Sequence, residues 1–367
     1  INLKIFPVKI LYIAPENTVG TLNLWKQGHE ELGNHCRYIT YYPSMLGYED
    51  DIVLNLPFVG TSQHYIKIRT ILQRLFYNRD PLAEKIEQYP KWEPVNFLEK
   101  YWFYFRDYLW SNKIEKVIDK YNLNHFDVVH FEWGLDFYRD CRFAKRMKDN
   151  GKALICHYHG PDLRVRGVIP KLDNLSNINL TNEVDLLTKH PNIDYLFLPY
   201  DTKKHKKKKR INNPIRLFHC TMNRYYKGSE LIINTCKKLK EKYKVEFILM
   251  EREPHQKVME TKSTCDINID QISNTGGWGY GMNSIESLSM GICTATNMNS
   301  QMRSFLPNHP FYEINKNTLF ADLEFLITHP EKIMEYGEKG KKWVEKNHHY
   351  SSVVQSLYQI YKSNNII

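Results

Sequence analysis

The sequence has no apolar run of about 18 residues, the length that a membrane-spanning helix requires. Its apolar segment at residues 8–14 (VKILYIA) is only as long as a strand and lacks the flanks of a signal peptide. The seven cysteines are scattered and form no CxxC pair, which argues against structural zinc and for reduced thiols. We therefore expect a cytoplasmic protein without a membrane span.

The composition is also not that of a disordered or fibrous protein. Of the 367 residues, 42% are hydrophobic and 25% are charged, which is typical of a globular protein. A chain of this length predicts two domains, each large enough to bury its own core.

The net charge of +10 comes mostly from one segment. Lys203, Lys204, residues 206–209 and Arg210 supply seven positive charges, which leaves +3 for the rest of the chain. Such a run is typical of a solvated loop, of a contact with an anionic membrane, or of a nucleic-acid site. The nucleic-acid interpretation is the least favoured of the three, and we expect no nucleic-acid partner.

The first half of the chain alternates between apolar runs and helical spacing. Helices are expected at residues 22–32 and 138–148. Continuous rather than alternating apolar strands predict a parallel sheet that is covered on both faces. The predicted strands lie at residues 8–14, 36–42, 126–131 and 153–157.

An aromatic and basic insert, about residues 62–112, separates these strands. Its segments 65–78 (IKIRTILQRLFYNR) and 97–110 (FLEKYWFYFRDYLW) have helical spacing. The insert can be a pair of helices that pack on the first domain, or a surface that faces a membrane or an acceptor, because aromatic residues beside Arg and Lys suit a lipid headgroup interface.

The second half repeats the pattern. Two helical tail segments are expected at about 317–347 and 351–362. We predict an α/β protein with two Rossmann-like domains, residues 1–200 and 201–347, that face each other across a deep cleft, and a C-terminal helical segment, 348–367, that packs back on the first domain. The elements predicted for the second domain are strands at 216–220, 245–250, 266–270 and 292–296, and helices at 229–243 and 284–290.

The most informative stretch is residues 276–291 (GGWGYGMNSIESLSMG), which follows a strand and opens a helix. Glycines allow close approach of the backbone, and free N–H groups at a helix start can face an anion such as phosphate. The stretch lacks the third glycine of a dinucleotide fingerprint and the GKS or GKT of a P-loop. The candidate donor-binding residues here are Gly279, Tyr280, Gly281, Met282, Asn283 and Ser284.

Glu286 follows them, in what we predict to be the first turn of the helix. Its carboxylate can accept hydrogen bonds from the two hydroxyls of a ribose. The alternative is a charge that only offsets the helix dipole.

Arg224 and Lys227 lie in the segment NRYYKG, residues 223–228, after a predicted strand. A guanidinium and an ammonium three residues apart can neutralise a diphosphate, although a solvated pair in a loop remains the alternative.

His159 lies in the segment HYHGPDLR, residues 157–164, at the end of a first-domain strand, where it can touch substrate. His157 and His159, one residue apart, can alternatively bind zinc, but we expect the two side chains to face opposite ways in a strand, which argues against a zinc site. Asp162 and Arg164 are expected to support this loop.

These marks together resemble the GT-B glycosyltransferases of the retaining GT4 type. The resemblance rests on FDVVH (126–130), HGPD (159–162), NRYYKG (223–228) and DINIDQ (266–271) followed by GYGMNSIESLSMG (279–291), and it runs through most of the chain. It implies that His159 lies near the donor sugar, that Arg224 and Lys227 bind the nucleotide diphosphate, and that Glu286 binds the ribose. We take His159, Arg224 and Lys227 as the catalytic candidates.

The chain departs from the family at one position. The residue eight before Glu286, where the family has a glutamate that contacts the donor sugar, is Trp278. Asp270 or Gln271, at the end of the preceding strand, can compensate for it. A degenerate, non-catalytic member is the alternative.

The resemblance implies transfer of a sugar from a UDP- or GDP-sugar to a hydroxyl acceptor, a glycan or lipid-linked glycan, with retention and without a metal ion or other cofactor. We expect the acceptor near Gly20, Glu132, Trp133 and Asp162, although Glu132 can equally form a structural ion pair. The membrane interpretations of the insert and the lysine run imply peripheral attachment to an anionic membrane surface. The competing hypotheses are a sugar-nucleotide epimerase or hydrolase on the same fold, and a nucleic-acid-binding or scaffold protein that uses residues 203–210.

Overall fold

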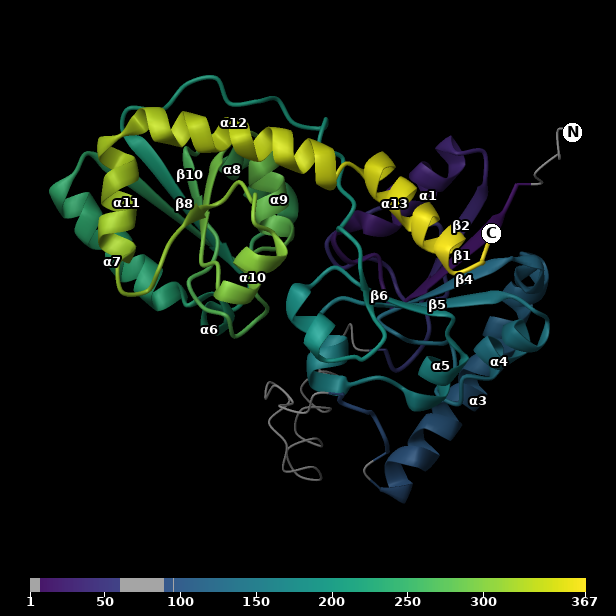
Figure 1. The fold of residues 1–367 in the computed structure, drawn as a ribbon. Helices are drawn as coiled ribbons and strands as arrows, with labels where there is room; N and C mark the ends of the chain where they lie inside the picture. The colour runs from purple at the N-terminus through teal and green to yellow at the C-terminus, as the bar shows by residue number, and fades with distance from the viewer. Residues whose placement is uncertain (1–6, 60–88, 95) are drawn as a thin grey trace, which may run out of the picture. The chain divides into compact units, whose positions relative to one another are not determined.

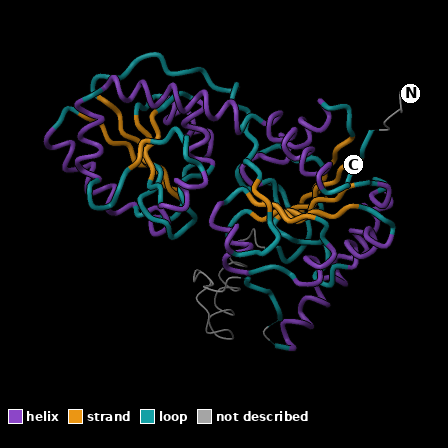
Figure 2. Tube along the Cα trace, viewed as in Figure 1, coloured by secondary structure: helices purple, strands orange, loops and turns teal. Residues whose placement is uncertain are grey.

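The computed structural model describes residues 7–59, 89–94 and 96–367. They divide into two compact units: the first contains the residues up to Leu196 and also Val354–Ile367, and the second is Phe197–Val353. Each unit is built on one parallel sheet with helices packed against it (Figures 1 and 2). The chain leaves the first unit after Leu196, where the sequence predicted a boundary at residue 200.

The sheet of the first unit has seven strands in the order β3-β2-β1-β4-β5-β6-β7, all parallel. β4 is buried at every position, as expected for a strand with both faces covered. The sequence predicted β1, β2, β4 and β5, but not the short strands β3, β6 and β7. The strands are β1 (Lys9–Ala14), β2 (His35–Thr40), β3 (Ile52–Val53), β4 (Val128–Glu132), β5 (Ala153–Tyr158), β6 (Ile178–Thr181) and β7 (Asp194–Tyr195).

One helix of the first unit begins later than predicted. α4 starts at Arg142 rather than at residue 138, because Tyr138 is fully buried and Cys141, with φ of 59°, sets the turn into the helix. The helices and helical turns of this unit are α1 (Thr21–Glu31), α3 (Phe97–Lys120), α4 (Arg142–Asp149), α5 (Pro170–Leu175), η1 (Thr18–Gly20), η2 (Leu123–His125), η3 (Asp162–Arg166) and η4 (Val184–Thr188).

α3 contains the second half of the predicted insert. The helix is capped by the side chain of Asn96, which accepts a hydrogen bond from the backbone N–H of Glu99, and it continues ten residues beyond Trp110, to Lys120. The first helical segment of the insert lies outside the described residues, which resume at residue 89. Within the described part of the chain, no helix combines the length and the apolar character needed to cross a membrane.

The sheet of the second unit has five parallel strands in the order β12-β11-β10-β8-β9. Each predicted strand of this unit is present with slightly different ends, and β12 is added at the edge. The strands are β8 (Ile215–Thr221), β9 (Val245–Glu251), β10 (Ile267–Ile269), β11 (Cys293–Thr296) and β12 (Tyr312–Glu313).

The helical segment predicted at about 317–347 consists of two helices. α11 ends at Thr328 and α12 begins at Pro330, whose ring cannot continue a helix but suits its first position. α9 begins at Met282, two residues earlier than predicted. The helices of the second unit are α6 (Arg224–Lys227), α7 (Ser229–Lys242), α8 (His255–Ser263), α9 (Met282–Ser289), α10 (Ser300–Phe305), α11 (Leu319–Thr328) and α12 (Pro330–Asn347).

The last helix, α13 (Tyr350–Ser363), contains residues of both units, and its end is part of the first. The hydroxyl of Tyr358 lies 3.0 Å from Nδ1 of His29, on α1. The hydroxyl of Tyr361 lies 2.5 Å from Nε2 of His130, in the middle of β4. The first unit is thus completed by the final residues of the sequence.

Candidate functional site

The predicted phosphate-binding segment joins β10 to α9 in the second unit. Two of its glycines have backbone conformations that favour glycine, with φ of 117° at Gly277 and 74° at Gly279. A Cβ at position 279 would fall 2.5 Å from Cε of Met302. The chain then enters α9 at Met282, and the first N–H groups of a helix have no partner within the helix itself. This geometry suits the binding of an anion at the helix start.

Asp270, directly after β10, connects two of the predicted segments. Its buried carboxylate accepts hydrogen bonds from Lys227 Nζ at 2.5 Å, Ser284 Oγ at 2.5 Å and Asn283 Nδ2 at 2.9 Å. Burial alone would raise the pKa of Asp270, but the charge of Lys227 and the three hydrogen bonds hold it below the ordinary value. The structure thus brings Lys227 to the start of α9.

Gln271, the neighbour of Asp270, orders the glycine loop. Its Nε2 donates to the carbonyl of Gly277 at 3.0 Å, and its Oε1 accepts from Lys227 Nζ at 3.4 Å. Gln271 therefore holds the residue before Trp278, whereas Asp270 contacts the start of α9 through Asn283 and Ser284. Whether either takes over the sugar contact of the missing glutamate stays a prediction.

Arg224 is placed differently from Lys227, although both lie on the single turn α6. Its guanidinium binds Glu251 through Nε at 2.7 Å and Nη2 at 2.6 Å, and Glu230 through Nη1 at 2.8 Å. These bonds raise the pKa of Arg224 above its ordinary value. The two cations thus have separate carboxylate partners, and the side chain of Arg224 is 44% exposed, so a diphosphate can reach it.

Glu286 lies in the second turn of α9, so the prediction that it lies in the first turn is wrong. A carboxylate interacts with the helix dipole mainly in the first turn, so the helix-dipole alternative has no support. The carboxylate is buried and contacts two side chains of α8. Its Oε2 accepts a hydrogen bond from Nζ of Lys262, and its Oε1 lies 2.7 Å from Nε2 of His255. Burial would raise the pKa of Glu286, but Lys262 and His255 lower it. Neither partner was predicted from the sequence, because no helix was expected between β9 and β10.

Tyr280 is less available to a ligand than predicted, because its side chain contacts other residues of its own unit. Gly281 has no side chain and can offer a ligand only its backbone. The hydroxyl of Tyr280 lies 3.0 Å from Nε2 of His348, and its ring packs among Phe311, Trp343 and His348. Tyr280 therefore anchors the loop in the core of its own unit. Gly281, with φ of −147°, is the residue before α9.

A second group of predicted residues lies in the first unit, at the carboxyl ends of β1, β4 and β5, which are adjacent parallel strands. Glu132, the last residue of β4, pairs in register with His157 of β5. Oε2 of Glu132 lies 2.5 Å from Nε2 of His159, whose Nδ1 lies 2.7 Å from Oδ1 of Asn182. The structure thus brings Glu132 and His159 together, although the sequence assigned them to different roles, and Asp162 lies in the loop that follows His159.

The prediction that His157 and His159 face apart is wrong. Their ring centroids are 4.3 Å apart, because residues two apart along extended chain lie on the same face of a sheet, and His159 directly follows β5. Burial would lower the pKa of His159, but Glu132 raises it to about 9. At neutral pH this edge of the sheet therefore holds an imidazolium paired with a carboxylate.

Glu132, His157 and His159 have the residue types of a zinc site, and their ligand atoms lie within 4.8 Å of one another. Ligand atoms around a tetrahedral zinc ion, each about 2.0–2.1 Å from the metal, lie about 3.3 Å apart. The 2.5 Å between Nε2 of His159 and Oε2 of Glu132 is shorter than this spacing, because the two groups contact each other directly, as a hydrogen-bonded ion pair does. The geometry favours the ion pair over the metal.

Asp162 and Arg164 hold the loop after β5. Asp162 accepts hydrogen bonds from the backbone N–H groups of His159 at 2.8 Å and Gly160 at 2.7 Å. The guanidinium of Arg164 binds Glu183 and Asp185. The two side chains contact protein groups that fix the position of His159.

Gly20 lies in the segment between β1 and α1, and Trp133 directly follows Glu132 at the end of β4. Gly20 precedes α1 with φ of 73°, and a Cβ there would fall 2.5 Å from Cδ1 of Tyr48. Trp133, directly after β4, also has a positive φ, 62°, and its carbonyl accepts a hydrogen bond from Nη2 of Arg166 at 2.5 Å. Both residues define tight backbone turns around the edge that carries Glu132.

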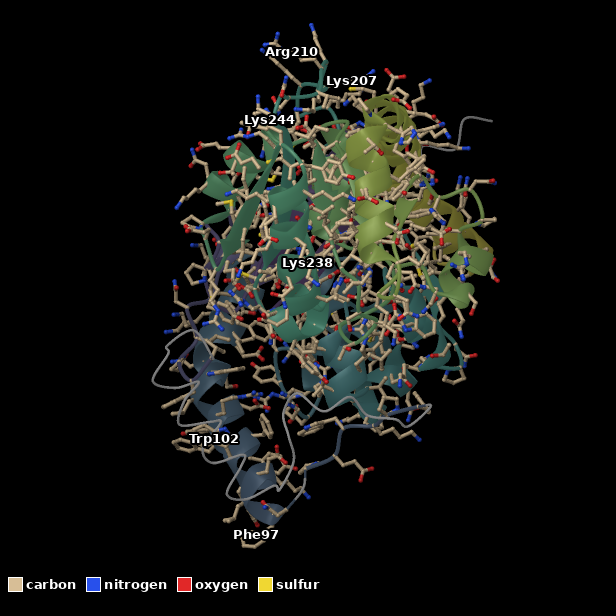
Figure 3. The ribbon with its side chains drawn as sticks, turned by 90° about the vertical axis from the view of Figure 1, so that its left-hand side faces the viewer. Phe97, Trp102, Lys207, Arg210, Lys238 and Lys244 are labelled. Carbon is tan, nitrogen blue, oxygen red and sulfur yellow. The ribbon has the colours of Figure 1, made fainter. Side chains whose placement is uncertain are left out.

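The lysine run is a loop of the second unit, and Figure 3 shows Lys207 and Arg210 at one end of that unit. Lys207 binds Glu338 at 2.6 Å and Lys208 lies 3.1 Å from Asp266. Two of the seven charges are therefore engaged in ion pairs within the unit. The exposed members of the run include Lys203, Lys206 and Lys209.

The sequence matches no protein-family model and no curated protein. Solved structures do match. They include an α-glucosyltransferase in complex with UDP-glucose and DNA containing an abasic site, with a TM-score of 0.56, 9% identity and coverage of 96% of this chain and 99% of that one. TarM has a TM-score of 0.59 at 11% identity, with 96% and 98% covered, and OtsA has 0.58 at 9%, also with 96% and 98% covered.

These neighbours are GT-B glycosyltransferases. At such low identity the likeness concerns the fold, and it confirms the predicted α/β class with two Rossmann-like units. The chain has the GT-B fold.

Proposed function

We propose that the chain is a glycosyltransferase that moves a sugar from a nucleotide diphosphate sugar to a hydroxyl acceptor with retention at the anomeric carbon. The observation that carries the proposal is the arrangement around Asp270, which holds Lys227 at a glycine-lined helix start. An ammonium has three donors, so Lys227 keeps one for a phosphate oxygen beyond its contacts with Asp270 and Gln271. The complex of an α-glucosyltransferase with UDP-glucose, a protein of the same fold, supports the proposal.

In the proposed reaction, the bond between the anomeric carbon and the diphosphate oxygen breaks, and a bond from the acceptor oxygen forms on the same face. The acceptor proton goes to the leaving phosphate. Lys227, Arg224 and the N–H groups at the start of α9 stabilise the negative charge that grows on the diphosphate. These groups supply the positive charge that a metal ion would otherwise provide, so we propose that the reaction needs no metal.

His159 is assigned to the donor sugar, with Glu132 and Asn182 fixing its ring. The acceptor is assigned to the first unit, near Gly20 and Trp133. We propose a glycan or lipid-linked glycan as the acceptor, used at an anionic membrane surface. The exposed aromatic residues of α3 support the membrane part, and Figure 3 shows Phe97 and Trp102 on that helix.

The test is calorimetric titration with UDP, GDP and their common sugar conjugates, with and without Mg²⁺. One nucleotide should bind in both conditions, and Arg224→Ala should weaken its binding about 10- to 100-fold, as expected for lost charge-assisted bonds. Arg216→Ala is the matched control, because Arg216 also binds a glutamate of β9, Glu246, but at the other end of β8. Equal binding by Arg224→Ala and the wild type would contradict the donor site.

Product analysis tests the chemistry. With donor and acceptor, NMR of the product should show the anomeric configuration of the donor. Incubation with donor alone separates the alternatives, since an epimerase or hydrolase would convert the nucleotide sugar without an acceptor. Conversion at full rate under that condition would overturn the transferase proposal.

A further inference from the structure

A lysine with no solvent exposure lies beside the carboxylate assigned to the ribose. Lys262, on α8, is 0% exposed, and its Nζ binds Oε2 of Glu286. Burying a lysine is costly unless its charge is paired and its donors are used. Nζ also lies 3.3 Å from the carbonyl of Asn283, in the first turn of α9, and 5.9 Å from the ring of Phe218.

His255 approaches the same carboxylate from the same helix. It lies seven residues before Lys262, which puts both on one face of α8. Its Nε2 donates to Oε1 of Glu286 at 2.7 Å. The side chain of His255 is 26% exposed while that of Lys262 is 0% exposed, so a ligand reaches the carboxylate on the side of His255.

A carboxylate has about four acceptor positions, and Lys262 and His255 use one on each oxygen of Glu286. The two that remain match the two hydroxyls of a ribose. The charge of Lys262 also lowers the pKa of Glu286, which keeps the carboxylate ionised and able only to accept.

We propose that Lys262 and His255 are positioning residues that hold Glu286 in one orientation for the 2′- and 3′-hydroxyls of the donor nucleotide, with His255 at the rim of this ribose subsite. The inference rests on the proposed function. It adds that the enzyme discriminates between ribose and deoxyribose through α8, a helix that no sequence motif marked.

The experiment compares calorimetric affinities for the nucleoside diphosphate that binds and for its 2′-deoxy and 3′-deoxy forms. The wild type should prefer the ribonucleotide about 10- to 100-fold, as expected for hydrogen bonds to a charged acceptor. Lys262→Met should reduce that preference to within about twofold of unity, and His255→Ala should reduce it at least about threefold. A merely structural role of Lys262 would weaken all three ligands equally and leave the ratio unchanged.

Lys257→Met is the matched control, because Lys257 lies on α8 and pairs with Glu253, away from Glu286. It should keep the wild-type ratio. If Lys262→Met does not fold, the double variant Lys262→Met, Glu286→Gln removes both buried charges together, and His255→Ala tests the rim separately. The inference would be overturned if His255→Ala and a folded Lys262 variant both kept the wild-type ratio of affinities for the ribonucleotide and its deoxy forms. Nucleotide binding, and with it the proposed function, would remain supported in that case. Absence of any nucleotide binding would overturn both.

Discussion

His348 is a buried imidazole whose two ring nitrogens are both engaged. Its Nδ1 donates to the carbonyl of Leu198 at 2.7 Å, and its Nε2 accepts from the hydroxyl of Tyr280 at 3.0 Å. Burial lowers the pKa of His348 to about 4. Since a neutral ring is needed to accept from Tyr280, the protonation state of His348 is coupled to the anchor of the glycine loop.

This coupling predicts acid sensitivity of the second unit. His348 binds a proton below about pH 6.5 in the unfolded chain, but only near pH 4 in the folded chain. The contribution of the neutral ring to the free energy of unfolding is therefore fully present above pH 6.5 and decreases as the pH falls toward 4. Between pH 7 and pH 4.5 the wild type should lose roughly 2–3 kcal/mol more free energy of unfolding than His348→Gln. Urea unfolding at the two pH values measures the difference.

The control for His348→Gln is His35→Gln, which removes an exposed imidazole. It should reproduce the pH dependence of the wild type. If His348→Gln shows the same loss between pH 7 and pH 4.5 as the wild type, the buried ring is not the source of the acid sensitivity.

At the scale of elements, the loop between β10 and α9 depends on one backbone conformation. Gly279 has φ of 74°, where an L side chain is strained, and its missing Cβ leaves room for Met302. Gly279→Ala should therefore cost about 1–2 kcal/mol of stability and weaken nucleotide binding. Thermal unfolding and calorimetry on the same samples measure both effects.

Gly281 offers the matched comparison two residues later. Its φ is −147° and a Cβ there would meet no atom within 4 Å. Gly281→Ala should change the stability by less than about 0.5 kcal/mol. Equal destabilisation by both substitutions would show that the left-handed turn at Gly279 is not what shapes the loop.

The elements that the sequence predicted well are those with strong local signals. β1, β4 and β5 are near-continuous apolar runs, and a buried parallel strand has that pattern. β3 and β7 have two residues each, too few for any pattern. The helix break before Pro330 did have a local signal, and the helical spacing on both sides obscured it.

The candidate site could be predicted where a segment follows a predicted strand. Lys227 and Glu132 follow or end predicted strands, so their segments were recognisable. Their partners come from elsewhere: Glu286 contacts Lys262, 24 residues earlier, and His159 contacts Asn182, 23 residues later. Contacts of this kind depend on how helices and loops pack, which no local periodicity reports.

At the scale of the whole molecule, the exposed apolar surface of residues 7–59, 89–94 and 96–367 is concentrated in the first half of α3. Aromatic rings with polar tips suit the interface between lipid headgroups and acyl chains. The second half of the helix is instead buried through Trp110, Ile114 and Ile118. The exposed apolar residues of the first half are Phe97, Leu98, Tyr101, Trp102, Tyr104, Phe105, Tyr108 and Leu109.

We therefore expect the protein to sediment with lipid vesicles through two surfaces that can be separated. Replacing Trp102 and Tyr108 by serine should reduce sedimentation with both zwitterionic and anionic vesicles, because the contact is mainly apolar. Replacing Lys203, Lys204, Lys206 and Lys209 by glutamine should reduce it only with anionic vesicles, since each basic residue near such a surface contributes about 1 kcal/mol. Unchanged sedimentation of both variants would remove the support for a membrane-surface acceptor.

The end of α13 has a consequence for how the protein is made. Tyr358 and Tyr361 bind His29 and His130, residues that leave the ribosome more than two hundred positions earlier. Domains usually fold in the order of their synthesis. The first unit needs residues 354–367 to complete its core. The second unit, residues 197–353, is therefore synthesised in full before the first unit can finish folding.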